Sequence, residues 1–168
     1  MTFERWNDGA RLSVIKAQEV RERGDELALT ERHLLQGILE TRCDAADVLM
    51  ALGFDRLADQ SEAPTGAIAL AEEGSADSLQ HPSNLQVLTA VSESARVDAI
   101  RRRSPSVTSC QLAITLLDRL ISAEPDAAAR NSAARLAGEL RAAGLDLAAA
   151  RDALVDHLGA VLTGPSSP

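Results

Sequence analysis

Apolar residues recur every three or four positions along most of this 168-residue chain, a spacing that places them on one face of a helix. Val14, Ala17 and Val20 follow this pattern near the start, and Leu34 and Ile38 follow it again. The pattern therefore predicts an all-α protein. The pattern predicts eight helices, of which the fourth is a short one that begins after residue 55. The other seven cover approximately residues 3–23, 30–41, 45–52, 84–103, 109–120, 126–143 and 146–162.

Residues that favour helix ends mark several of the predicted boundaries. Gly24 and Gly53 follow the first and third helices, and glycine is the commonest residue just past a helix C-terminus. Thr30 stands at the N-cap position of the second helix. Thr108 and Gln111 have the spacing of a capping box, in which two side chains bond the free amides at a helix start. These signals support the helical interpretation.

A segment of different composition divides the chain in two. It gathers proline, glycine, serine and glutamate residues, including Pro64, Gly66, Gly74 and Pro82, and is typical of a linker. We expect residues 1–163 to form one domain that ends in a disordered tail at 164–168. Its expected parts are repeat one at about 3–60, the linker at about 61–82 and repeat two at about 84–162.

The two helical halves are copies of one motif. Residues 17–34 align with residues 95–112 without a gap, so that Thr30 corresponds to Thr108. The second copy carries extra residues at about 122–132. Neither copy is long enough to bury much core alone. We therefore expect two four-helix repeats related by a pseudo-two-fold axis.

Composition and charge narrow the function. Hydrophobic residues make up 45% of the chain and aromatic residues only 2%, a balance that favours helices over strands. The net charge of −8 opposes binding to phosphate backbones. The run Arg101–Arg103 is therefore interpreted as a solvated helix C-terminus, where cations meet the negative end of the helix dipole, rather than as a nucleic-acid site.

The reactive side chains form no recognisable catalytic or metal-binding set. Cys43 and Cys110 lie far apart, and the histidines are isolated, so no zinc signature is present. His33 lies near Glu31 and Cys43, but no third group has a supporting spacing. No signal peptide or membrane-spanning run stands out. We expect a cytoplasmic protein that needs no cofactor, is not an enzyme, and binds neither membrane nor nucleic acid.

Four blocks of sequence resemble the N-terminal domain of Clp unfoldases, most closely the ClpC type. They read FERWND at 3–8, AR at 10–11, AQE at 17–19 and TERHLLQGIL at 30–39. The resemblance extends over about residues 3–162 and is stronger in repeat one. It implies a double four-helix fold and a domain that docks substrates and adaptors for ATPase rings that feed a protease. The chain contains no Walker A pattern, so it resembles a free-standing or excised N-domain that cannot hydrolyse ATP.

The resemblance also implies a ligand site at Thr30 and Glu31. In some ClpC-type domains a glutamate at this position helps to bind phosphoarginine on proteins marked for degradation. A carboxylate can accept hydrogen bonds from a guanidinium, and helix N-terminal amides suit a phosphate. Asn7 stands for a threonine of the family, and Ser109 replaces the acid in repeat two. The alternative is that Thr30 only caps the helix and Glu31 only favours its dipole.

A second implied site takes cyclic-peptide natural products between the two repeats. Phe3 matches one of the two phenylalanines that the family uses, and the other is replaced near His81. Arg11 belongs to the same N-terminal block and is included among the expected ligand-binding residues. The alternative for Phe3 and Trp6 is that they anchor the first helix in the core, where large apolar residues usually lie.

These observations together predict a non-catalytic binding module. It would capture protein substrates or cyclic peptides and modulate Clp proteolysis, as an adaptor or as a decoy, with Clp ATPase and protease components as partners. One alternative is a small all-α regulator or enzyme that uses the neighbourhood of Glu31 and His33. Another is a decayed paralogue that keeps the helical packing and has lost the ligand site.

Overall fold

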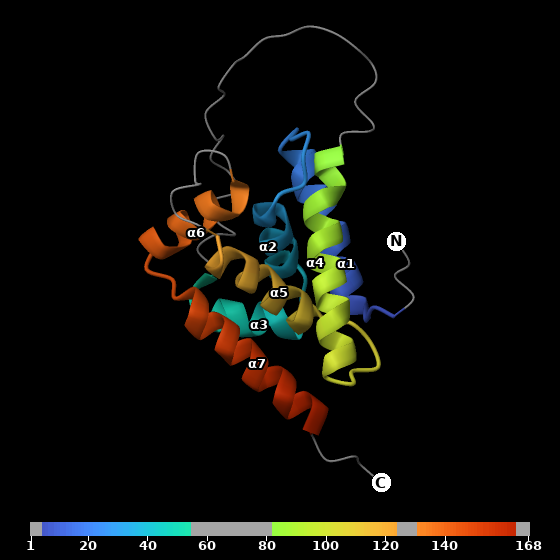
Figure 1. Ribbon diagram of the computed structural model, residues 1–168. Coiled ribbons are helices and arrows are strands. Elements are labelled where there is room, and N and C mark those ends of the chain that lie inside the picture. The colour runs from blue at the N-terminus through green and yellow to red at the C-terminus, as the bar shows by residue number, and fades with distance from the viewer. Residues whose placement is uncertain (1–4, 55–81, 124–130, 164–168) are drawn as a thin grey trace, which may run out of the picture.

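The computed structural model describes residues 5–54, 82–123 and 131–163, and within these ranges the chain folds into seven α-helices. Repeat one contributes the first three helices and repeat two the last four (Figure 1). The all-α prediction is confirmed. The helices are α1 (Asp8–Arg23), α2 (Glu31–Glu40), α3 (Asp44–Ala51), α4 (Pro82–Arg101), α5 (Ser109–Ile121), α6 (Ser132–Ala142) and α7 (Leu147–Thr163). The helix expected after Asp55, most of the linker and the tail lie outside the described residues.

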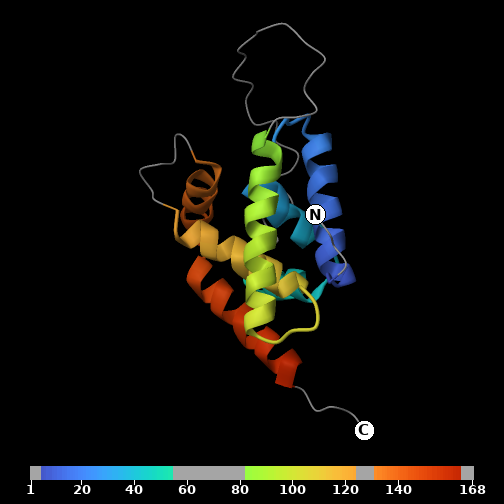
Figure 2. The same ribbon diagram turned by 45° about the vertical axis from the view of Figure 1, so that its right-hand side comes forward.

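Helices α2 and α5, which occupy equivalent places in the two repeats, form the centre of the fold. Seven of the ten residues of α2 and nine of the thirteen residues of α5 are buried. Helix α1 packs along α2, while α4 and α7 pack on α5. Figures 1 and 2 both show α5 in the middle of the molecule, with α4 crossing it and α7 below it. The core is therefore shared between the repeats, as expected for copies too small to fold alone.

Gly37 determines how closely α1 and α2 approach each other. A Cβ atom on Gly37 would lie 2.4 Å from the carbonyl oxygen of Ser13 and 2.5 Å from the backbone nitrogen of Ala17. These distances are far below van der Waals contact, so a side chain at this position would force the two helices apart. Glycine is required here for packing, because its missing Cβ leaves room for the neighbouring backbone.

The first helix starts later than its sequence pattern predicts. The pattern indicates a helix from about residue 3, whereas α1 begins at Asp8 after the N-cap Asn7. The preceding residues are extended, because the N–H of Val107 donates to the carbonyl of Arg5 at 2.7 Å and the N–H of Asn7 donates to the carbonyl of Val107 at 2.9 Å. Trp6 and Val107 thus form an isolated parallel β-bridge between the two repeats. This long-range pairing competes with the local helical pattern and replaces it.

Other helix ends agree with the sequence or differ from it for local reasons. Gly53 has a positive φ angle of 89° and lies just beyond α3, as predicted, and Gly144, with a φ of 82°, lies in the same way just beyond α6. Gly24 has a φ of −81°, and the left-handed residue that follows α1 is Asp25. Helix α6 starts only at Ser132, since the side chain of Asn131 caps it. Aspartate tolerates the left-handed conformation of Asp25 better than most residues, because its short side chain can bond the backbone locally.

Candidate functional site

The start of α2 carries the motif that the sequence singles out. Thr30 is the N-cap of this helix, as predicted, and its backbone N–H donates to Nδ1 of His33 at 3.0 Å. Histidine here takes the role that Glu or Gln has in a capping box. Because Nδ1 accepts this bond, the neutral ring carries its proton on Nε2, which lies 3.4 Å from Oε1 of Glu26. Burial lowers the pKa of His33 from its ordinary value, since it disfavours the charged ring.

Glu31, the first residue of α2, lies at the junction of three helices. Its side chain is 0% exposed, and its Oε1 accepts a hydrogen bond from Nε of Arg119 on α5 at 2.7 Å. Its Oε2 accepts a hydrogen bond from the hydroxyl of Ser132 at the start of α6. A buried carboxylate requires such partners, because an unpaired charge in the interior is costly. The three side chains therefore join repeat one to repeat two.

This arrangement bears directly on the predicted ligand site. The carboxylate of Glu31 faces a guanidinium, which is the chemistry expected for an arginine ligand, but the guanidinium belongs to the chain's own Arg119. An external arginine can reach Glu31 only if Arg119 moves away. The side chain of Arg119 is 41% exposed and so has open solvent beside it. The ligand role of Thr30 and Glu31 stays a prediction.

Asn7 lies beside repeat two rather than beside Thr30 and Glu31. Its Oδ1 accepts from the N–H of Ala10 at 2.8 Å and so caps α1, while its backbone N–H bonds Val107, just before the α5 N-cap. Two residues on, a Cβ atom on Gly9 would lie 3.4 Å from the hydroxyl of Ser109. Asn7 is thus near Ser109, the position in repeat two at which the ClpC-type pattern has a glutamate.

Arg11 fastens the N-terminal segment to α1. Its Nε donates to the carbonyl of Trp6 at 2.9 Å, and the residue is exposed. Trp6 is only 6% exposed and belongs to the core, which confirms the alternative for this residue. Phe3 and His81, the other two expected peptide-binding residues, lie outside the described residues. Within the described ranges, no hydrogen bond joins Asn7 or Arg11 to the start of α2.

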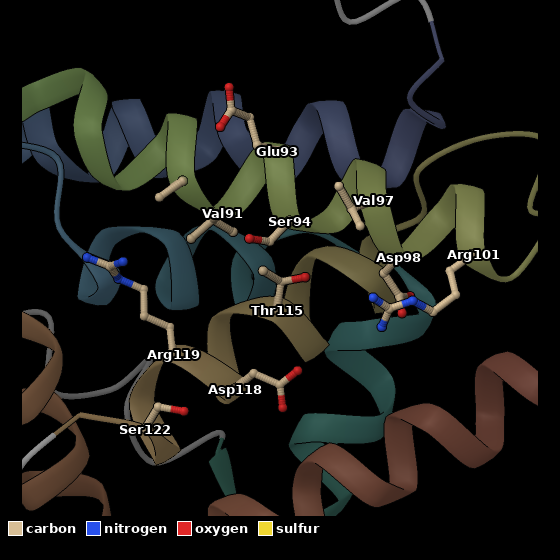
Figure 3. A pocket seen from close by; sticks show the side chains of 11 residues that line it. Val91, Glu93, Ser94, Val97, Asp98, Arg101, Thr115, Asp118, Arg119 and Ser122 are labelled. Carbon is tan, nitrogen blue, oxygen red and sulfur yellow. The ribbon is translucent and has the colours of Figure 1, made fainter.

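An open cavity of about 670 Å³ adjoins Arg119 and lies between α4 and α5. Figure 3 shows Arg119 near one end of it and Arg101 near the other, with Asp118 between them. Its other lining side chains are a mixture of apolar residues, such as Val97, and polar residues, such as Glu93. The cavity therefore leads from solvent to the guanidinium that covers Glu31.

Sequence reasoning did not find Arg119 and Ser132. They are 88 and 101 residues away from Glu31 along the chain. Arg119 is one of many arginines on predicted helices, and Ser132 lies at the edge of the extra segment of repeat two. Local spacing carries no signal for either contact. If the burial of Glu31 had been known, it would have suggested that the carboxylate needs a cationic partner, because a buried charge is costly when it is unpaired.

Among the remaining reactive groups, the thiol of Cys110 is poorly placed to act as a nucleophile. Cys110 is buried, and this burial raises the pKa of its thiol to about 12. In the described part of the chain, no three side chains of His, Cys, Asp or Glu gather as a metal site requires. The described helices include none long and apolar enough to span a membrane.

Comparison with known proteins identifies the fold. No family model matches the chain, and no curated protein matches its sequence. Among solved structures, the chain is similar to the N-terminal domain of the caseinolytic-protease-associated chaperone ClpD from Arabidopsis thaliana. The two are 17% identical with a TM-score of 0.55, and the match covers 95% of this chain and 97% of that domain. The chain therefore has a Clp N-domain-like, all-α fold of two related helical repeats, as the sequence resemblance implied.

Proposed function

We propose that this chain is a non-catalytic binding module that docks protein substrates or adaptors of a Clp protease and modulates proteolysis. The observation that carries this proposal is the similarity to a Clp N-terminal domain over 95% of the chain. Fold alone does not define function, so the proposal also draws on the residues at the start of α2. Its partners would be Clp ATPase or protease components and their substrates, in the cytoplasm.

The contact between Glu31 and Arg119 supports arginine recognition as the chemistry of the site. The Glu31 carboxylate accepts a charge-assisted hydrogen bond from a guanidinium at 2.7 Å, and such bonds are stronger than neutral ones. The amides at the start of α2 suit a phosphate beside that guanidinium. Phosphoarginine is therefore the proposed ligand at Thr30 and Glu31. Arg119 would compete with it, so the unmodified chain should bind free phosphoarginine weakly.

The N-terminal segment supports the second proposed ligand, a cyclic peptide that contacts both repeats. Asn7 and Arg11 are fixed near repeat two by the backbone pairing of Trp6 with Val107. Phe3 precedes this fixed segment in the sequence and would supply an aromatic contact. His81 would replace the aromatic residue on the side of repeat two.

Two binding experiments test the proposal. Calorimetry would titrate the chain and its Arg119→Gln variant with phosphoarginine and with a cyclic peptide of the kind that ClpC-type domains bind. A pull-down would probe Clp ATPase and protease subunits. We expect Arg119→Gln to bind phosphoarginine more tightly than the parent chain, and Glu31→Gln to abolish that gain. Arg135→Gln is the matched control, since it removes an exposed arginine on α6.

Failure of all three probes would overturn the proposal. That result requires that neither the parent chain nor any variant binds phosphoarginine, the cyclic peptide or a Clp subunit. The decayed paralogue would then be the better description. The occupied Glu31 and the serine at position 109 favour that alternative, because both reduce the free acid that a guanidinium ligand needs.

A further inference from the structure

A second, smaller cavity of about 230 Å³ lies where the N-terminal segment meets repeat two. Its walls come from three places that are distant in sequence: Arg5 and Trp6 before α1, the last part of α4, and the loop 104–107 that leads into α5. Its lining includes neither Glu31 nor any residue of the cavity beside Arg119. It is therefore a separate feature of the surface.

Backbone hydrogen bonds hold the walls of this cavity in place. The carbonyl of Arg5 accepts from the N–H of Val107 at 2.7 Å, which ties the N-terminal segment to the loop. The loop turns back on α4, since the N–H of Ser104 donates to the carbonyl of Ala99 at 2.9 Å. The hydroxyl of Ser104 also donates to the carbonyl of Ser106 at 2.6 Å. The cavity is thus built into the fold and needs no rearrangement to exist.

The charge of the cavity is one-sided. Arg5 and Arg96 both line it and are exposed, and no acidic residue is among its lining residues. Neither guanidinium has an ion pair or hydrogen bond within the described residues, whereas Arg23, Arg102 and Arg119 are paired with acids. In a chain of net charge −8, two guanidinium groups that have no acidic partner among the described residues give this small cavity a local positive charge. Arginine is suited to planar or tetrahedral oxyanions, because its N–H groups form a fork.

The floor of the cavity is apolar. It includes Trp6, which is 6% exposed, and Ile100, which is 65% exposed although it is a large aliphatic residue. Pro105 and Val107 complete this side. An apolar floor under a charged rim suits a ligand that carries an anionic group next to an aliphatic one. A volume of about 230 Å³ admits one or two side chains, and is below the usual size of a drug-like pocket.

We infer that this cavity binds a peptide segment in which a phosphate or carboxylate group lies next to an aliphatic side chain. Arg5 and Arg96 contact the anionic group, and Trp6 and Ile100 contact the aliphatic side chain. The inference deepens the proposed function by adding an acidic recognition element for bound proteins. It rests on that function for its biological setting, but its chemistry involves neither Glu31 nor a Clp partner.

Trp6 provides a direct probe, because it is the single tryptophan of the chain and lines the cavity. The experiment follows its fluorescence during titration with four acetylated leucine-rich tetrapeptides. Three end in an amide and differ at the third residue, which is serine, phosphoserine or aspartate. The fourth has serine and a free C-terminal carboxylate. The last three distinguish phosphate, side-chain carboxylate and terminal carboxylate as the source of the anionic group.

We expect at least one anionic peptide to bind about tenfold more tightly than the neutral serine amide, which is the range for one or two charge-assisted hydrogen bonds. Arg5→Gln and Arg96→Gln should each remove most of that difference, and higher salt should weaken it. Both residues are exposed, so these variants should keep the fold. Ile100→Ser should weaken all four peptides alike. Arg135→Gln on α6 is the charge-matched control.

Two results would overturn the inference. One is equal affinity for the neutral and all anionic peptides. The other is a loss in Arg135→Gln as large as in Arg5→Gln and Arg96→Gln, which would indicate only a general effect of net charge. The titration contains no phosphoarginine and no Clp subunit. A negative result in this titration therefore does not contradict the proposed function. In the same way, failure of the phosphoarginine, cyclic-peptide and Clp experiments does not contradict binding at this cavity, which this titration alone tests.

Discussion

Glu31 and Arg119 form an ion pair of 2.7 Å between two helices that belong to different repeats. The two partners are unequal, because the carboxylate is 0% exposed while the guanidinium is 41% exposed. Arg119 can turn into solvent, but Glu31 cannot. The pair therefore links the two repeats, and its guanidinium can move away while its carboxylate stays buried. Substitutions at the two positions should therefore have unequal effects on the stability of the protein.

The first prediction concerns the stability effect of this asymmetry. Arg119→Ala should reduce the free energy of unfolding more than Glu31→Gln does, because it leaves a buried carboxylate without its cation. A buried pair that loses one partner is destabilised by about 3–5 kcal/mol, and the exposure of Arg119 should reduce this to roughly 2 kcal/mol. Urea unfolding at neutral pH measures both variants, with Arg135→Ala as the control. The idea is wrong if Glu31→Gln is the more damaging change.

A second prediction follows from the close approach of α1 and α2. Gly37→Ala should destabilise the protein by roughly 3 kcal/mol, since the new methyl group would overlap the backbone of Ser13 and Ala17. Gly138→Ala is a matched control within α6, where an added Cβ would meet no atom within 4 Å. That control should stabilise the protein by about 0.5–1 kcal/mol through helix propensity. Thermal unfolding distinguishes the two, and equal effects would contradict the packing role of Gly37.

The third prediction is a dependence of stability on pH. The pKa of His33 is lowered in the folded protein, so the unfolded chain binds a proton more readily. The contribution of neutral His33 to the free energy of unfolding should therefore be fully present above pH 6.5, the ordinary pKa of histidine in the unfolded chain. It should decrease as the pH falls from there toward the lower pKa that His33 has in the folded protein. Protonation of Nδ1 would also remove the bond that it accepts from Thr30.

The variant His33→Gln tests this dependence directly. It gives repeat one the same capping pair that repeat two already has, in which the Thr108 N–H donates to Oε1 of Gln111 at 2.9 Å. The helix start should remain capped, while the loss of stability below pH 6.5 should shrink. Urea midpoints at pH 7.5 and pH 5.5 provide the comparison. An unchanged pH dependence in the variant would show that His33 is not its source.

A fourth prediction concerns the two thiols. Cys110 is buried with a pKa of about 12, so almost no reactive thiolate exists at pH 8. Cys43 is half-buried and should react with iodoacetamide well before Cys110 does. Mass spectrometry of digested protein gives the rate at each site, and added urea should remove the difference. Faster labelling of Cys110 in the native protein would show that its thiol is accessible to solvent and contradict its burial.

The part of this protein that could be predicted from sequence is the part that local patterns encode. The spacing of apolar residues predicted the helices, and Thr30 and the Thr108–Gln111 pair were correctly assigned as helix caps. These features depend on residues within one or two helical turns of each other, so the local sequence is enough to predict them. The internal repeat and the ClpC-like blocks extended this to a fold, which the comparison with a solved structure confirmed.

The sequence by itself thus determined the all-α class, the two repeats and most of the helix ends. Only the tertiary structure decided that Arg119 and Ser132 cover Glu31, that Asn7 lies beside repeat two, and that the first helix begins at Asp8. The physical reason is distance along the chain. Helices and caps arise from contacts within a few residues, whereas an ion pair between residues 88 positions apart exists only once the core has brought the two repeats together.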